Sequence, residues 1–270
     1  MTSPSGSSPP GGEPAPRGLD VPPAEATGSG RRPLRRWLIP ALVLAPIVAA
    51  VAVYLLYFTG DSPDRLTLST PQDQPSGQSS PPTTTATASG GPAGRWTVGT
   101  GSVAGYRVKE KLVRLPAQSE GVGRTEAVTG VVTVAQAGGG LEVQSVQMEV
   151  DVSQLKSDEA MRDNRIRTIG LETTKFPKAT FATTGPVAVP APVVQGERTT
   201  VEAAGDLTIH GVTRKVTIPL QVQMTGGRAE VAGSLTFPMS DFGITPPSIG
   251  GFVTVEPDAT LEFQLFLTRG

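Results

Sequence analysis

The single histidine, His210, is the side chain best suited to acid–base chemistry in this sequence. Asp206 lies four residues earlier, and positions 206, 208 and 210 share one face if the segment is a β-strand. Such a pair could act as a general base or contact a polar ligand. Alternatively, His210 orients a tight turn at His210-Gly211, and this structural role is the favoured interpretation.

Asp241, within FPMSDFGI, is a second candidate for chemistry. An aspartate ahead of Phe242-Gly243 more commonly accepts backbone N–H bonds in a turn. Catalysis would require His210, Asp206 and Asp241 to converge in one pocket. We therefore predict that the protein is not an enzyme and has no catalytic residues.

Metals, nucleotides and nucleic acids are disfavoured by the composition. One histidine and zero cysteines exclude His-rich and cysteine metal sites. The run Gly121-Val122-Gly123-Arg124 lacks the Gly-Lys-Ser/Thr ending of a phosphate-binding loop. The formal net charge is −1, and residues 95–270 hold 17 Lys plus Arg against 18 Asp plus Glu. No basic surface for nucleic acid is expected, and we predict no metal, no cofactor and no nucleic-acid partner.

The elements that position these residues are indicated by alternation of apolar and polar side chains. Within 215–225, Val216, Ile218, Leu220, Val222 and Met224 share one face, as in a half-buried strand. Strands are predicted at 96–108, 124–135, 141–152, 179–187, 201–210, 215–225, 230–238 and 259–267. The phase change near Gln144 and Ser145 predicts a β-bulge. The pattern indicates an all-β antiparallel barrel or sandwich, with a short helix at 157–170 across one end.

The N-terminal third divides by composition. Residues 37–58 carry no charge and reach roughly 33 Å as a helix, which predicts a transmembrane signal anchor. A cleaved signal peptide is the alternative, but its apolar region is usually shorter. Four arginines precede the span, so the N-terminus is expected in the cytoplasm and the C-terminal domain outside the cell membrane. The predicted organisation is a disordered cytoplasmic tail at 1–36, the anchor at 37–58, a Ser/Thr/Pro/Gly linker at 59–94 and one folded domain at 95–270.

Several segments, in order, carry a family resemblance. They are Arg95-Trp96-Thr97-Val98, Ser102, Arg124 to Gly130, Met161-Arg162-Asp163, Lys175 to Phe181, Gly205 to Arg214 and Ser240-Asp241-Phe242-Gly243-Ile244. Together they resemble the YceI-like family of extracytoplasmic lipid-binding barrels. The resemblance implies a lipocalin-like, eight-stranded antiparallel barrel, here preceded by one transmembrane helix.

The resemblance also implies a function. The expected ligand is a polyisoprenoid, an isoprenoid quinone or a similar long amphiphile, held in an apolar cavity for sequestration or transport. Cavity candidates are Met148, Val150, Phe181, Val216, Ile218, Leu220, Val222, Leu235, Phe237 and Phe242. Polar candidates for its mouth are Arg162, Arg165, His210, Arg214 and Asp241. The alternative is a structural or protein-interaction module with a filled barrel, because periodicity alone does not distinguish a hollow barrel from a solid core.

Overall fold

The computed structural model describes residues 48, 51–52, 62–69, 91–112, 118–138, 140–190, 196–249 and 253–270. The chain divides into two compact units, Met1–Ala50 and Val51–Gly270. Within the first unit the description covers one residue, Val48, so the fold below is that of the second unit.

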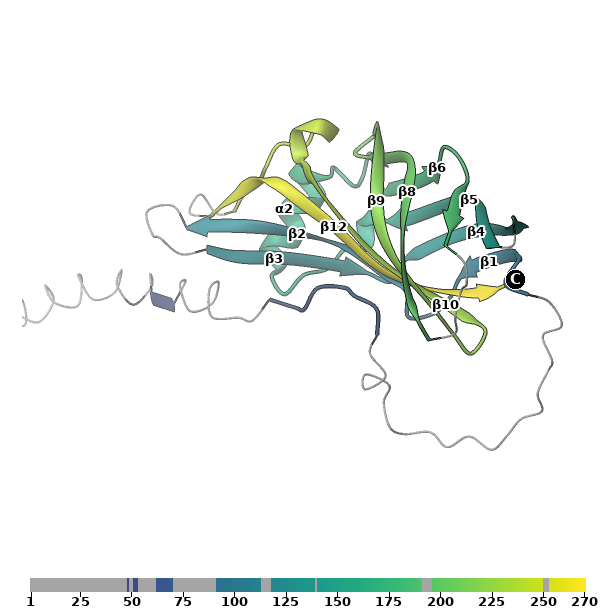
Figure 1. Cartoon of the computed structure of the whole chain (residues 1–270). Helices are drawn as coiled ribbons and strands as arrows, with labels where there is room; N and C mark the ends of the chain where they lie inside the picture. Colours follow the sequence, from purple (N-terminus) through teal and green to yellow (C-terminus); the bar gives the residue numbers. More distant parts are fainter. Residues whose placement is uncertain are drawn as a thin grey trace, which may run out of the picture. The chain divides into compact units, whose positions relative to one another are not determined.

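The second unit is a closed antiparallel barrel (Figure 1). Strands β1, β4, β5, β6, β8, β9, β10 and β12 pair in that order, and β12 pairs back with β1. Along the same edge of β12, the β2–β3 hairpin continues the wall beyond β1. Two short strands complete the sheet: β7 pairs with β5, and β11 pairs with β12. The bounds are β1 Gly94–Val98, β2 Val103–Leu112, β3 Gln118–Thr125, β4 Val128–Ala137, β5 Gly140–Asp151, β6 Lys178–Thr183, β7 Val187–Val189, β8 Arg198–Ile209, β9 Val212–Thr225, β10 Arg228–Pro238, β11 Ser248–Ile249 and β12 Val253–Arg269.

The alternation in the sequence predicts the antiparallel barrel correctly, but the strand predicted at 96–108 is two strands, β1 and β2, and the alternation does not predict β3. The alternation also locates an irregularity. Thr133 pairs with Ser145 and Val134 pairs with Val143, so Gln144 is the extra residue of β5. This confirms the predicted bulge, which brings the two apolar halves of β5 onto one face of the sheet.

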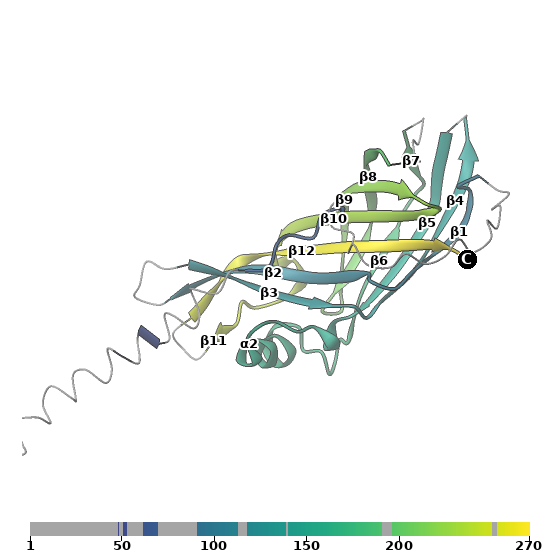
Figure 2. The same ribbon diagram turned by 90° about the horizontal axis from the view of Figure 1, so that it is seen from below.

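A short helical segment crosses one end of the barrel, beside the β2–β3 hairpin (Figure 2). It consists of α2, Ala160–Arg165, followed without a break by a π-helical turn, η2, Ile166–Gly170. The predicted helix began at Ser157, but the side chain that caps α2 is that of Glu159. Ser157 instead donates from its backbone N–H and its hydroxyl to the Asp163 carboxylate, at 2.9 and 2.7 Å. Short 3-10 turns, η1 (Val152–Gln154) and η3 (Met239–Phe242), close the same end.

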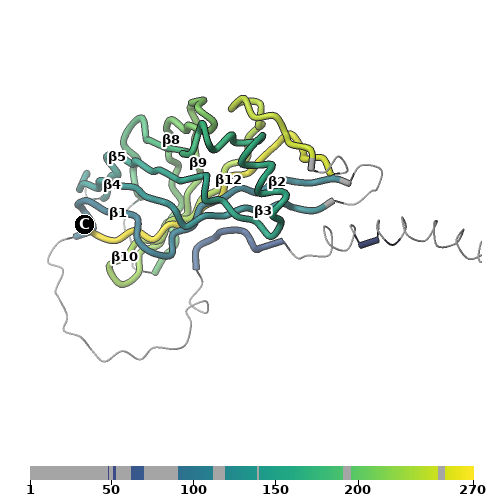
Figure 3. The backbone as a smooth tube through the Cα atoms, turned by 180° about the vertical axis from the view of Figure 1, so that it is seen from behind, coloured from purple at the N-terminus to yellow at the C-terminus, as the bar shows by residue number. Residues whose placement is uncertain are grey.

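The predicted anchor lies almost wholly outside the described residues. Of 37–58, the structure describes Val48, Val51 and Ala52, which are helical and exposed. None of the helices that the structure describes has both the length and the apolar character needed to cross a bilayer. The anchor therefore stays a prediction. Most of the predicted linker is likewise outside the description, but residues 62–69 are described and lie along the outside of the barrel (Figure 3).

Candidate ligand-binding cavity

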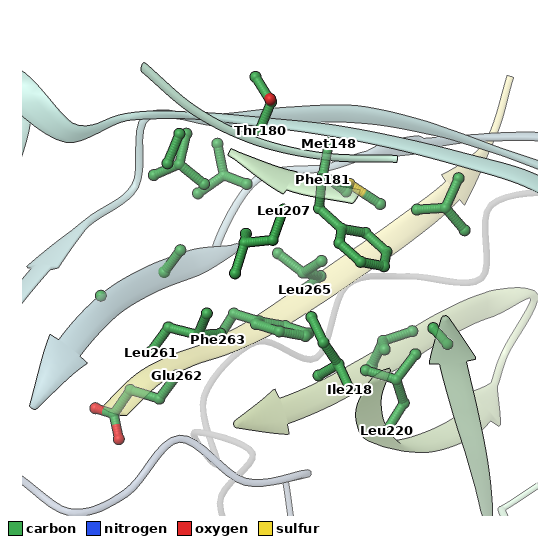
Figure 4. A pocket seen from close by; sticks show the side chains of 18 of the residues that line it. Met148, Thr180, Phe181, Leu207, Ile218, Leu220, Leu261, Glu262, Phe263 and Leu265 are labelled. Carbon is green, nitrogen blue, oxygen red and sulfur yellow. The ribbon is translucent and has the colours of Figure 1, made fainter. Parts of the chain in front are cut away.

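The inside of the barrel is hollow. A cavity of about 310 Å³ runs between the walls and is lined by side chains of most strands. Figure 4 shows Met148, Phe181, Leu207 and Ile218 converging on this space from different strands. The lining is almost entirely apolar; its polar members are Tyr106, Thr180, Glu197, Thr199 and Glu262. Glu262 points away from the other labelled side chains in Figure 4, and its carboxylate is bound by two arginines, Arg107 and Arg124.

Seven of the ten apolar candidates line this cavity: Met148, Val150, Phe181, Ile218, Leu220, Val222 and Phe237. The other three are not among the lining residues. Phe242 is buried in a hydrophobic cluster, and Val216 and Leu235 pack against the same cluster. Other members of this cluster, such as Met239, do line the cavity. Nine of the ten lie on strands, where alternation places them, whereas Phe242 lies in η3. Near η3 some apolar residues, such as Met239, border the cavity and others, such as Phe242, do not.

The burial of the lining residues shows where the cavity ends. At the end covered by α2 and η3, lining residues such as Val152, Leu155 and Ile166 are buried. At the opposite end, Leu141 and Val189 are half-buried, and Glu197, which also borders the cavity, is exposed. Among the described residues the barrel is thus closed at the α2 end and reaches solvent at the end where β5 and β8 begin and β7 ends.

Tyr106 brings a polar atom into the closed half. It comes from the inward face of β2, and its ring lies over Gly123, where an added Cβ would stand 2.3 Å from a ring carbon. Its hydroxyl is buried without a hydrogen-bond partner among the residues that the structure describes. Burial raises the pKa of Tyr106 well above its ordinary value, although the charge of Arg162 opposes the shift. The phenol is therefore neutral and able to donate.

Arg162, predicted at the mouth, lies instead in a buried ion pair at the closed end. Its Nε and Nη2 donate to the two carboxylate oxygens of Glu110, at 2.7 and 3.0 Å. The side chains are 3% and 0% exposed. Burial lowers the pKa of Arg162, but the hydrogen bond and charge of Glu110 outweigh that effect and hold the pKa above its ordinary value. The pair joins α2 to β2, so the guanidinium of Arg162 binds a carboxylate of the same chain and does not lie at the mouth of the cavity.

The other four polar candidates also fail to border the cavity. Arg165 is half-buried on α2, and Asp241 is exposed in η3. Arg214 is exposed and donates to the carbonyl of Thr213 at 3.2 Å. These polar candidates lie at the closed end of the barrel or on its surface, and they do not form one site.

His210 has the structural role favoured by the sequence. It forms the two-residue β8–β9 turn with Gly211, and both have positive φ, 52° and 73°, as in a type I′ hairpin. Its Nε2 lies 2.9 Å from Glu172 Oε2 and its Nδ1 3.2 Å from the carbonyl oxygen of Phe242. The hydrogen bond with His210, and then the charge of Lys175, lower the pKa of Glu172. Asp206 instead pairs with Lys215, at 3.2 Å, so His210, Asp206 and Asp241 do not form a catalytic site.

The sequence analysis missed Tyr106 and Glu110, although a signal was present. Ala104, Tyr106, Val108 and Glu110 alternate along β2, which places a carboxylate on an inward face. A buried charge requires a partner, but the sequence does not show that Arg162, 52 residues away, supplies it.

A closed, eight-stranded antiparallel barrel around an apolar hollow defines a lipocalin-like binding barrel. Residues 99–267 match the model of the YceI-like domain. The chain therefore belongs to the YceI-like family, as the ordered motifs indicate.

Curated relatives and a solved structure agree with this assignment. A UPF0312 protein of Vibrio cholerae is 33% identical over 119 residues, 42% of this chain and 59% of the relative. A UPF0312 protein of Pseudomonas syringae pv. tomato is 31% identical over 128 residues, 45% and 62% of the two chains. The matches thus span about three fifths of those relatives. A polyisoprenoid-binding domain from Saccharophagus degradans, described as implicated in plant cell wall breakdown, has a similar fold, with a TM-score of 0.50 and 18% identity over 66% of this chain and 99% of that one.

Proposed function

We propose that this protein is a membrane-tethered, extracytoplasmic binding protein that holds one long apolar ligand in the barrel cavity, for sequestration or transport. The proposed ligand class is a polyisoprenoid, an isoprenoid quinone or a similar amphiphile. The observation that carries the proposal is the cavity itself, whose lining is almost entirely apolar. The fold shared with a domain described as polyisoprenoid-binding supports this ligand class.

The physical basis is burial of a slender chain. The volume of about 310 Å³ is at the lower end of the range for ligand pockets, which suits a thin chain. At roughly 25 cal/mol per Å², a ligand burying about 400 Å² of apolar surface gains on the order of 10 kcal/mol before the entropic costs of association. Binding of this kind needs no charged contact. The alternative function, a module with a filled barrel, is disfavoured by the cavity.

The tether and the location belong to the same proposal. The uncharged span at 37–58, with Arg31, Arg32, Arg35 and Arg36 before it, supports a cytoplasmic N-terminus and an extracytoplasmic barrel. Protease added to spheroplasts should digest or release the barrel and leave the N-terminal tail protected. Protection of the barrel in intact spheroplasts would contradict this orientation.

The ligand is tested by purifying the full chain in detergent, extracting it with organic solvent and examining the extract by mass spectrometry. A stoichiometric prenyl or fatty lipid is expected. Val222→Trp, which fills the cavity, should abolish its retention, and Gln221→Trp, which places the same side chain on the exposed outer face, should not. Val150→Phe is a second, smaller filling variant. Absence of any stoichiometric lipid, with no uptake of added prenyl lipid by the wild-type chain, would contradict the proposal.

A further inference from the structure

Residues 62–69, here called the strap, lie extended along the outside of the barrel beside β3 (Figures 1 and 3). Their first half is held by hydrogen bonds to the barrel wall. The Ser62 hydroxyl donates to the carbonyl oxygen of Glu120 at 3.1 Å, and Arg107 Nη2 donates to the carbonyl oxygen of Pro63 at 2.7 Å. Arg124 Nη2 donates to the carbonyl oxygen of Asp64. The barrel thus binds the strap through its backbone.

The arginines that bind the strap belong to an ionic cluster on the outer wall, in which Arg107 and Glu262 are buried and Arg124 and Glu120 are half-buried. Arg107 is 4% exposed and Glu262 2%, which is unusual for charges on the outward faces of strands. Arg107 Nη1 pairs with Glu120 at 2.7 Å, and Arg124 Nη2 pairs with Glu262 at 2.8 Å. Desolvated ion pairs are tolerated when their remaining donors are satisfied. The carbonyl groups of Pro63 and Asp64 satisfy two of these donors.

The second half of the strap is held at a separate place. Leu68 is 2% exposed, although its segment reads as part of a polar linker. The backbone N–H and hydroxyl of Ser69 donate to Glu230 Oε1 at 2.7 and 2.9 Å. Gln264 Nε2 donates to the same oxygen at 2.7 Å. The strap is therefore fixed at both ends, from β3 to β10.

We propose that the strap is the attachment point of the tether, so that residues 59–61 alone, and not the whole of 59–94, set the distance between membrane and barrel. This inference rests on the anchor at 37–58, which is part of the proposed function. From Phe58 to Ser62 there are four Cα–Cα steps, which span at most about 15 Å. A free coil of the length of 59–94 would have a reach on the order of 35 Å. The strap therefore holds its barrel within reach of the lipid surface, and residues 70–90 do not lengthen the tether.

Two matched insertions test the proposal in the full chain. Because the chain has no cysteine, Thr217→Cys, on the exposed face of β9, provides one labelling site. The labelled chain is reconstituted in vesicles that carry an acceptor fluorophore on their lipids. A Gly/Ser segment of about 20 residues, which adds a reach of roughly 25 Å, is inserted after Gly60 or after Pro81.

The insertion after Gly60 should lower energy transfer several-fold, whereas the insertion after Pro81 should leave it unchanged. An equal change for both insertions would overturn the proposal, because it would show that the strap does not hold the tether. A chain that does not co-float with the vesicles would instead contradict the anchor, and with it both the proposed tethering and this inference. Lipid retained by the chain purified in detergent would still test ligand binding in the cavity, independently of the anchor.

A second measurement tests the strap without a membrane. Leu68→Asp should release the strap, and Thr67→Asp, at an exposed neighbouring position, should not. In detergent, trypsin should then cleave after the exposed Arg65 several-fold faster in Leu68→Asp than in the wild type or Thr67→Asp. In vesicles, Leu68→Asp should make the insertion after Pro81 lower energy transfer. Equal cleavage of all three chains would overturn the docking on which the inference depends.

Discussion

The guanidinium of Arg162 and the carboxylate of Glu110 form a two-point hydrogen-bonded ion pair inside the closed end of the barrel, at 2.7 and 3.0 Å. The pair connects the only α-helix that the structure describes in the barrel to β2. Gly121 makes room for it, since a Cβ there would lie 2.6 Å from Glu110 Oε1 and 2.7 Å from Arg162 Nε. The helix that covers this end is therefore joined to β2 by a buried charge pair.

Replacing one partner should be more damaging than replacing both. Arg162→Met leaves the Glu110 carboxylate buried without its counter-charge, and we expect a loss of about 3–5 kcal/mol in the free energy of unfolding. The double variant Arg162→Met/Glu110→Met should recover much of this loss. Urea titrations measure both values, with Lys215→Met as a control because its pair with Asp206 is exposed and worth about 1 kcal/mol or less. A double variant less stable than either single variant would contradict the expectation.

Removing the Tyr106 hydroxyl should not destabilise the protein. The oxygen is buried with no hydrogen-bond partner among the described residues, so Tyr106→Phe removes an unsatisfied polar group. The free energy of unfolding should stay constant or rise by about 1 kcal/mol. Ser102→Ala is the contrasting variant. Its hydroxyl donates to the Gly99 carbonyl oxygen at 2.7 Å and accepts from the Phe266 N–H at 3.0 Å, so a loss of about 1–3 kcal/mol is expected. A comparable loss in Tyr106→Phe would show that its hydroxyl has a partner.

Gly205 should not tolerate a methyl group. A Cβ there would lie 2.4 Å from the backbone oxygen of Ala182 and 2.6 Å from the ring of Phe181, which crosses β8 at this point. Gly205→Ala should therefore lower the free energy of unfolding by about 1–3 kcal/mol. Gly185→Ala is the matched control, since nothing lies within 4 Å of its added Cβ. Thermal or denaturant unfolding gives the difference, and equal stability of the two variants would show that β6 and β8 separate at little cost.

The Glu172–His210 contact should make stability depend on pH in the acid range. The pKa of Glu172 is lowered from its ordinary value of 4.5, chiefly by the hydrogen bond with His210. A lowered carboxyl pKa stabilises the folded state above pH 4.5, and this contribution is lost as the pH falls through the lowered value. The melting temperature of the wild type should exceed that of Glu172→Gln above pH 4.5, and the difference should shrink on acidification. A difference that grows as the pH falls would have the wrong sign.

The sequence by itself determined the all-β class, most of the strands, the bulge near Gln144 and the family, because alternation and bulges are local properties of the backbone and the motifs occur in order. It also placed apolar side chains on the inward faces of the strands, although it did not show that the barrel is hollow or which of the ten candidates border the cavity. These inferences need only the period of a strand, which fixes the face on which each side chain lies.

Tertiary structure decided which residues each inward-facing or outward-facing side chain contacts. Val222 lies on β9 and borders the cavity, whereas Phe242 lies in η3 and is buried in a hydrophobic cluster at the barrel end without bordering the cavity. From the sequence, Arg162 is a surface cation on a short helix. In the structure α2 packs beside β2, and Arg162 is paired with Glu110. From the sequence, Leu68 is part of a polar linker. In the structure Arg107 and Arg124 bind backbone carbonyl groups a few residues earlier in the same segment, which lies against the outer wall of the barrel. Burial of a charge or a linker residue depends on segments distant along the chain, and local periodicity carries no information about them.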